Sequence, residues 1–506
     1  MPVRSVHRAF AAAFTALILL PIGALLYEGF SGEAEGISAG HLWGLGADTL
    51  ILAGSVALAG ALIGAACALT VALFDFPGRG ILQWALAIPL TVPAYVLGYV
   101  FVALAETPHG RTWLPGFREH WGIFLVLAAS LYPYSYLFVR SVMGARERGQ
   151  IDAARALGTA PVQVLGRVIA PRIRRALLAA GAVIFVEVVA DLGTVAVFNY
   201  DTLTTGIFQA WHGMFSFQAA VQLGSLLLLI AAVLIGLEAA LVPSKGSEES
   251  RTLEHPHLRL GRGAGWTVSA LLWTWLGLIS AAPLLQLLVW GLGQIDHIGE
   301  WLGVFTATAV LAVLSALILT GCALLLVWGA VRRCDRVSAA AVRLGLLGYG
   351  IPGAVLAVGL LIALGPLGLI GSLAGLLAAY LIRFSGPLLR LLEGPVHQLG
   401  TLHEEAAQVL GEPRVMRRIA LPLLRGPLLL GAVLALIEVV KEMPMTLILR
   451  PLGWDTLAVK LYGLTVEGEW QAAALPALLL LLLGALPMWL LQWSQRRSEW
   501  LPVRSL

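Results

Sequence analysis

Asp152-Ala-Ala-Arg-Ala-Leu-Gly158, followed by Pro171, lies in a polar segment, residues 150–175, of a chain that is otherwise mostly apolar. A second copy lies in residues 402–425, where Glu405-Ala-Ala-Gln-Val-Leu-Gly411 is followed by Pro422. In each copy an acidic residue opens a run of helix formers. A glycine then stands where a helix readily ends in the left-handed conformation. Both copies therefore predict a helix, a turn and a second helix.

The composition is that of an integral membrane protein. Of the 506 residues, 59% are hydrophobic and 12% are charged, against about 25% charged in soluble domains. The mean hydropathy is +0.86. Cys67, Cys322 and Cys334 form no CxxC pair, so they indicate neither a disulfide framework nor a zinc site. The net charge of +4 does not indicate nucleic-acid binding, because membrane topology explains how the charges are distributed.

Twelve apolar runs are long enough to span a bilayer, which takes about 20 residues in a helix. They predict an all-α fold with twelve transmembrane helices in two sets of six. The first set lies near residues 9–26, 50–73, 82–104, 121–138, 176–196 and 217–242. The second set lies near residues 266–291, 304–330, 344–364, 369–389, 427–449 and 472–492. The sequence thus predicts a first half, residues 1–242, a polar linker, residues 243–265, and a second half, residues 266–506.

The positive charges predict the orientation in the membrane. With the N-terminus in the cytoplasm, Arg111, Arg118, Arg450 and Lys460 fall outside and Lys441 falls inside a span. The chain has 33 lysines and arginines. The other 28 are then assigned to cytoplasmic segments, as the positive-inside rule requires. We therefore expect both termini, the linker and both polar segments on the cytoplasmic side.

The two halves are repeats of each other. Glu187-Val-Val matches Glu438-Val-Val, and Pro93-Ala-Tyr-Val-Leu matches Pro352-Gly-Ala-Val-Leu. Both halves have six predicted spans in the same orientation. The sequence therefore predicts parallel repeats, related by a pseudo-twofold axis along the membrane normal.

Prolines predict two breaks in the spans. Pro89 and Pro93 interrupt the third run, and Pro444 follows Lys441 by about one helical turn. A proline inside a membrane helix removes a backbone hydrogen bond, and neighbouring polar groups must then satisfy the freed carbonyl.

Charged residues in two spans are the candidates for the translocation path. Glu187 and Asp191 are spaced to share one face of the fifth span, as are Glu438, Lys441 and Glu442 in the eleventh. Even on a lenient scale, an acid at the membrane centre costs about 3 kcal/mol. One hypothesis is that these residues line a path and that the four acids contact a hard cation transiently, without a resident metal site. The alternative is a salt bridge from Lys441 to Glu438, Glu187 or Asp191 that locks the two spans together.

The two polar segments resemble the EAA loops of ABC-importer permeases, the cytoplasmic element that docks on the ATPase. The pattern is an EAA triplet, a glycine, and then I-x-L-P. The first copy has Asp152 in place of Glu and Val168-Ile-Ala-Pro171 for I-x-L-P, whereas the second copy is two residues shorter between Gly411 and Pro422. The resemblance assigns ATPase contact to Asp152, Ala153, Ala154, Gly158 and Pro171, and to Glu405, Ala406, Ala407, Gly411 and Pro422.

Nearly the whole chain is similar to the fused, two-half permeases of the ferric iron family of ABC importers. The stretches that carry this resemblance are Ile88 to Gly98, Asn199 to Trp211, Lys441 to Pro451 and Trp454 to Leu457. It implies a type I importer fold in the bacterial inner membrane, fed with Fe³⁺ by a periplasmic binding protein. It also implies two copies of an ATPase subunit, which bind the ATP and magnesium, and no cofactor on this chain. The chain has no GxxxxGK[ST] motif, so a P-loop for ATP is not expected on it.

Other functions remain open at this stage. A fused permease for thiamine or a polyamine would also move a cation, and the same acids would suit it. A secondary transporter built from two six-span halves would explain the repeat but not the two EAA-like segments. No arrangement of residues supports a membrane enzyme.

Overall fold

The computed structural model describes residues 2–31, 38–143, 153–154, 156–214, 216–241, 258–399 and 416–499. Helices make up nearly all of this part of the chain. Its only strands are two residues each, β1 (Phe74–Asp75) and β2 (Leu258–Arg259), which pair in parallel. The prediction of an all-α membrane protein is confirmed.

The first half contains α1 (Pro2–Ser31), α2 (Ala39–Leu73), α3 (Arg79–Ala85), η1 (Ile88–Thr91), α4 (Ala94–Glu106), α5 (Pro108–Trp113), α6 (His120–Val142), α8 (Pro161–Val164), η2 (Leu165–Ile169), α9 (Ala170–Ala190), α10 (Gly193–Val197), α11 (Leu203–Phe208), η3 (Gln209–Gly213) and α12 (Phe217–Leu241). The second half contains α13 (Arg262–Leu276), η4 (Gly277–Ala281), α14 (Ala282–Leu292), η5 (Ile295–His297), α15 (Ile298–Val327), η6 (Trp328–Arg332), α16 (Arg336–Gly348), α17 (Gly353–Leu364), η7 (Gly365–Leu367), α18 (Leu373–Gln398), η8 (Met416–Ala420), α20 (Leu421–Lys441), α21 (Pro444–Leu449), α22 (Leu457–Val466) and α23 (Ala474–Glu499).

The internal repeat predicted from the sequence is confirmed in three dimensions. Helix α2 packs against α6 and α9 in the first half, and α15 packs against α18 and α20 in the second. Helices α9 and α20 have 21 residues each. Pro93 caps α4 with φ −56° and ψ 136°, and Pro352 caps α17 with φ −56° and ψ 137°. The same backbone plan therefore occurs twice.

The halves are interlocked, because the first helix of each crosses to the other half. Helix α1 packs against α16 and α17, while α13 and α14 pack against α3 and α4. Arg8 on α1 donates to Asp335, the N-cap of α16, over 2.7 Å. One buried hydrophobic cluster includes residues of both halves, so the two repeats share a core.

Eight described helices are long and apolar enough to cross a membrane, or nine if the bent pair α3–α4 is one span. The pair bends by 87° between Thr91 and Ala94, which confirms the break predicted at Pro89 and Pro93. Shorter apolar helices lie at residues 353–367, 457–466 and 474–490. The count of twelve spans stays a prediction.

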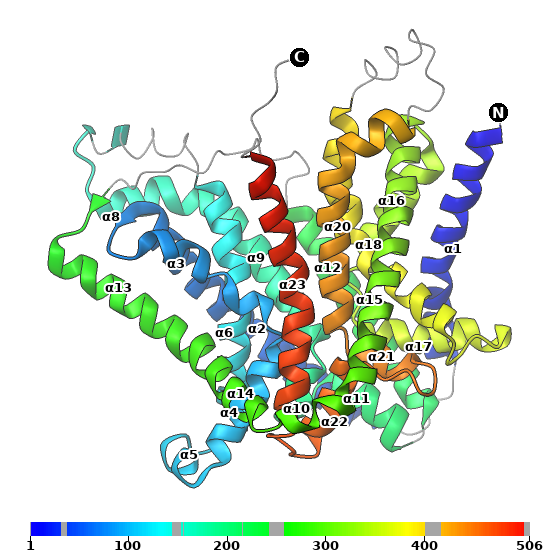
Figure 1. Ribbon diagram of the computed structural model, residues 1–506, viewed down its shortest axis with the longest axis horizontal. Helices are drawn as coiled ribbons and strands as arrows, with labels where there is room; N and C mark the ends of the chain where they lie inside the picture. The colour runs from blue at the N-terminus through cyan, green and yellow to red at the C-terminus, as the bar shows by residue number, and fades with distance from the viewer. Residues whose placement is uncertain are drawn as a thin grey trace.

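Figure 1 shows the two ends of the helical bundle. The start of α1, helix α8 and the last turns of α23 lie at one end. Helices α5, α10, α11 and α22 lie at the opposite end. This arrangement agrees with the prediction for the first polar segment and the two ends of the described chain, which share one side.

The close contact between α2 and α6 depends on a glycine. A Cβ at Gly64 would overlap the carbonyl oxygen of Tyr132 and lie 2.6 Å from Ser135 Cβ, whereas a Cβ at Gly44 on the same helix meets nothing within 4 Å. Small residues let membrane helices approach closely, so we expect Gly64→Leu to destabilise the protein by about 1–3 kcal/mol or more. Thermal unfolding in detergent measures this, with Gly44→Leu as the matched control. Equal melting temperatures for the two variants would contradict the packing.

Candidate functional site

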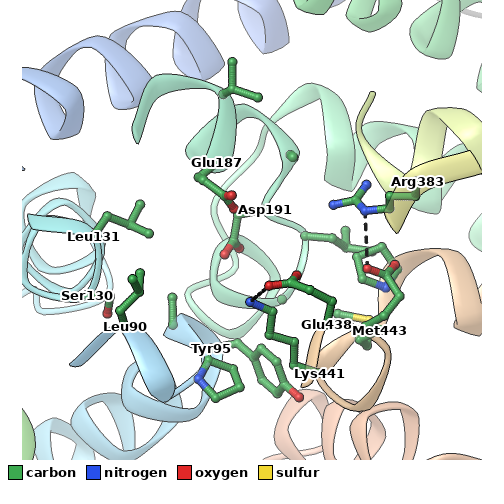
Figure 2. Close-up of a pocket in the computed structure, with 18 of the residues that line it drawn as sticks. Leu90, Tyr95, Ser130, Leu131, Glu187, Asp191, Arg383, Glu438, Lys441 and Met443 are labelled. Carbon is green, nitrogen blue, oxygen red and sulfur yellow. Dashed lines mark ion pairs between the residues drawn. The ribbon is translucent and has the colours of Figure 1, made fainter. Parts of the chain in front are cut away.

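A cavity of about 160 Å³ lies at the junction of the two halves. The first half lines it from η1, α4, α6, α9 and α10, and the second half from α18, α20, α21 and the residues before α17. Figure 2 shows charged side chains from both halves around this space. The charged residues that line it are Glu187, Asp191, Arg383, Glu438, Lys441 and Glu442. All five residues predicted for the translocation path therefore line one cavity.

Two of the acids lie just beyond helix ends. Helix α9 ends at Ala190, and the Asp191 carboxylate accepts the backbone N–H of Thr194 at 2.7 Å and its hydroxyl at 2.9 Å. Helix α20 ends at Lys441, and Glu442 Oε1 accepts the backbone N–H of Met445 at 3.0 Å. Each acid thus accepts a backbone N–H from the first turn of the short helix that follows. The sequence predicts that Asp191 lies on a helical face with Glu187, and Glu442 on one with Glu438. This detail is wrong, because each helix ends one residue before its acid.

The break after α20 was predicted from Pro444. Pro444 occupies the first turn of α21, where a missing N–H costs nothing. In the first half, Gly193 begins α10 at the matching break, and a Cβ there would lie 2.9 Å from the Tyr95 side chain. The two halves therefore reach the same backbone break through different residues.

The acids of the second half have cationic partners. Lys441 Nζ lies 2.8 Å from Glu438 Oε1 on the same helix, with side chains 35% and 26% exposed. Arg383 Nε lies 3.6 Å from Glu442 Oε2. Both pairs are drawn in Figure 2. The close ion pair of Lys441 therefore lies within α20.

Glu187 of the first half has a neutral partner instead. Its Oε1 accepts a hydrogen bond from the Tyr134 hydroxyl over 3.2 Å. The residue that matches Lys441 in the repeat is Ala190, which has no charge to offer. The cationic groups of the cavity thus belong to one half only.

Sequence reasoning missed Arg383, which it counted with the cytoplasmic residues. Arg383 lies inside α18, its side chain is 15% exposed, and its Nη1 donates to the Ile351 carbonyl over 2.9 Å. A Cβ at Gly353 would lie 2.9 Å from both Arg383 Nη1 and Glu442 Oε1. The available signal was a lone arginine inside the apolar run 369–389.

The cavity keeps an excess of negative charge. Four carboxylates against two cationic groups give a formal charge of −2 when all six are ionised. Within the described ranges, no three acidic, histidine or cysteine side chains are close enough together to hold a metal ion. The acids are distributed around the space, an arrangement that can attract a cation without enclosing it in one set of ligands.

The first polar segment forms the predicted turn. Gly158 has φ +76°, and the Thr159 N–H donates to the Ala154 carbonyl over 3.1 Å, as in a Schellman motif. Helix α8 begins at Pro161 and continues through η2 into α9. Gly158 is exposed, and so is Leu157, at 86%. The segment thus exposes an apolar side chain beside a hydrogen-bonded turn.

The prolines of the two copies occupy equivalent positions. Pro171 lies in the first turn of α9 and Pro422 in the first turn of α20. Ala153 lies in the short described stretch before the turn. The remaining predicted coupling residues, Asp152, Glu405, Ala406, Ala407 and Gly411, lie outside the described residues.

Comparison with known proteins gives one family and three relatives. The family model for the binding-protein-dependent transport system inner membrane component matches residues 60–245 and 326–500, once in each half. The chain is 25% identical to the Fe(3+)-transport system permease protein FbpB 2 of Haemophilus influenzae, over 88% of each chain. It is 26% identical to the probable sulfate transport system permease protein cysT of Nephroselmis olivacea, over 43% of this chain and 82% of that protein. Identity to the sulfate permease protein CysT of Synechococcus elongatus is 25%, over 44% of this chain and 85% of that protein.

The Glu438–Lys441 pair generates a stability prediction. Lys441→Met leaves the Glu438 carboxylate without its cation, so we expect a lower melting temperature. Adding Glu438→Gln removes the stranded charge and should recover part of the loss, which a double-mutant cycle measures. The control is Lys460→Met, because Lys460 pairs with Asp455 at 2.8 Å but is 47% exposed. The pairing would be contradicted if Lys441→Met lowered the melting temperature no more than Lys460→Met does and the double variant recovered none of that loss.

Proposed function

The chain belongs to the family of binding-protein-dependent transport system inner membrane components, and from that premise we propose that it is the fused permease of an ATP-driven importer that carries ferric iron into the cytoplasm. A permease of this kind is not itself an enzyme. The resemblance to the ferric permease extends over nearly the whole chain, whereas each sulfate permease corresponds to less than half of it. Both halves of the pore are then supplied by one polypeptide.

The acidic cavity is the observation that carries this proposal. Glu187, Asp191, Glu438 and Glu442 surround a space at the interface of the halves, where alternating movements of two repeats open a path in transporters. Carboxylate oxygens are hard ligands that suit a hard cation such as Fe³⁺. Their separate hydrogen-bond and ion-pair partners keep them apart, which favours release over retention.

Other cargoes fit the site less well. Sulfate is a dianion, and a cavity with a formal charge of −2 repels it. Thiamine and polyamines are organic cations that the acids would also attract. The resemblance to a ferric permease argues against them, and family membership argues against a secondary transporter.

Membership in this family implies an ATPase and a binding protein as partners. We propose two ATPase copies, one docked on each polar segment, 150–175 and 402–425. The ATPase subunits would bind the ATP and magnesium, and this chain would carry no cofactor. A periplasmic binding protein would deliver the iron to the opposite face. Leu157, exposed on the turn at Gly158, supports the first docking surface. Membrane lipid would surround the remainder, and no nucleic acid is involved.

We further propose twelve spans in the bacterial inner membrane, with both termini cytoplasmic. The halves are residues 1–242 and 266–506, joined by the cytoplasmic linker 243–265. The start of α1, helix α8 and the end of α23 lie at the same end of the bundle, which supports this orientation (Figure 1). The chain would then be a multi-pass membrane protein with its coupling surface in the cytoplasm.

Charge in the cavity generates an uptake prediction. Glu187→Gln removes the one glutamate that has only a neutral partner, so we expect iron uptake per folded transporter to fall about tenfold, as for the loss of one charge-assisted contact. Ala190→Lys should act in the same direction, because it places an ammonium where the second half has Lys441. The assay is uptake of radioactive ferric iron in cells, divided by the amount of folded permease.

Glu438→Gln serves as the graded comparison. Glu438 already has an ammonium partner, so its loss should reduce uptake less than the loss of Glu187. Normal uptake per transporter in both glutamine variants, with only the amount of protein reduced, would make these residues structural. If sulfate uptake depended on this chain while iron uptake did not, iron would not be the cargo.

The turn at Gly158 generates a coupling prediction. Its φ of +76° strains a β-branched residue, and no atom lies within 4 Å of an added Cβ, so Gly158→Val acts through the backbone alone. We expect normal membrane insertion and loss of substrate-stimulated ATP hydrolysis in the reconstituted complex. Gly158→Asn is the control, because asparagine tolerates the left-handed conformation. Full stimulation in the valine variant would refute a coupling role for the turn.

A further inference from the structure

Two buried hydroxyl groups on α4 have no hydrogen-bond partner in the part of the chain that the structure describes. They belong to Tyr95 and Tyr99, whose side chains are 6% and 0% exposed. The two residues are four positions apart and so lie on one face of the helix. A buried hydroxyl without a partner loses free energy compared with a phenylalanine ring in the same place. The packing of this conformation does not explain why tyrosine rather than phenylalanine occupies these two positions.

The repeat shows that the core does not require these hydroxyls. Because Pro93 matches Pro352, Tyr95 and Tyr99 correspond to Ala354 and Val358 in the second half. Both of those residues are buried and apolar. One half therefore packs the same stretch without polar groups, while the other half carries two unpaired ones.

Tyr95 connects this helix face to the cavity. Its side chain lines the same space as Glu187, Asp191 and Lys441 (Figure 2). From there α4 continues for three more turns to Glu106, at the end of the bundle where α5 and α22 lie (Figure 1). Tyr99 is thus one turn farther from the cavity in the direction of that end.

Tyr99 is covered by a side chain of the other half. Its ring stacks on Trp470, with ring centroids 6.5 Å apart and an angle of 7° between the planes. Trp470 lies between α22 and α23, and Arg118 of the first half holds its guanidinium 5.8 Å from the Trp470 ring centroid. Arg118 also pairs with Glu106 over 2.8 Å. Groups from both halves therefore meet beside the Tyr99 ring.

We propose that the Tyr95–Tyr99 face of α4 lines the outer segment of the translocation path, and that Trp470 closes it. Separation of the halves removes Trp470 from Tyr99 and Arg118, and the two hydroxyl groups then gain partners in water and the passing cation. Neutral phenol oxygens offer a hard cation contacts weaker than carboxylates, which suits passage toward the acidic cavity. The identity of the cargo in this account rests on the proposed function, whereas the position of the path does not.

Tyrosine-to-phenylalanine variants separate a path role from a structural one. Because neither hydroxyl has a partner in this conformation, Tyr95→Phe and Tyr99→Phe should melt at or above the wild-type temperature. Iron uptake per folded transporter should nevertheless fall about tenfold for each, the loss expected for a hydrogen-bonded contact to a charged group. The matched control is Tyr132→Phe. The buried hydroxyl of Tyr132 donates to the Leu86 carbonyl over 2.9 Å, and the change removes this hydrogen bond. It should lower the melting temperature and leave uptake per folded transporter unchanged.

A labelling experiment tests the path without cargo or ATPase. In a background lacking Cys67, Cys322 and Cys334, Tyr99→Cys should react slowly with a membrane-impermeant thiol reagent added outside intact cells. Adding Trp470→Ala should raise the labelling rate at least about tenfold, because the buried face is then uncovered. Unchanged labelling after Trp470→Ala, or normal uptake in both phenylalanine variants, would overturn the proposal. If the Trp470→Ala change speeds labelling but the protein imports no iron, the proposed position of the path is supported and iron as the cargo is contradicted.

Discussion

A carboxylate in the middle of a membrane must be hydrogen-bonded or paired with a cation, because leaving it bare in a low dielectric is prohibitively costly. This constraint organises the centre of the protein. Helices α9 and α20 stop where the Asp191 and Glu442 carboxylates can accept backbone N–H groups from the next short helix. The same breaks open the backbone around a cavity, so the groups that satisfy the acids also create the space between the halves.

The duplication repeats the backbone and the acids of the cavity but not the cationic groups. The second half provides Lys441 and Arg383, which pair with Glu438 and Glu442, while the first half pairs Glu187 with a tyrosine hydroxyl. A cation that enters the cavity therefore meets its least neutralised glutamate on the first half. The unpaired hydroxyls of α4 also belong to that half, which agrees with the outer path proposed along α4.

The sequence predicted the features that depend on local chemistry. The left-handed turn at Gly158, the breaks near Pro93 and Pro444, and the gathering of the span acids follow from residue type and spacing alone. It did not predict Arg383 in the cavity, because a lone arginine inside a span is easily assigned to the cytoplasmic end that follows it. It also did not predict that α1 packs on the second half, since an apolar helix surface does not specify which neighbour covers it.

We propose that the cargo passes through the cavity between the halves, where carboxylates from both halves hold it. The most direct measurement is an anomalous difference map at the iron absorption edge, from crystals of the iron-loaded complex with its ATPase trapped before release. The account predicts a peak inside the cavity between Glu187 and Glu438, absent when Glu187→Gln replaces the wild type. An iron peak elsewhere in the chain, or an anion bound against Lys441 and Arg383 in the same cavity, would contradict it.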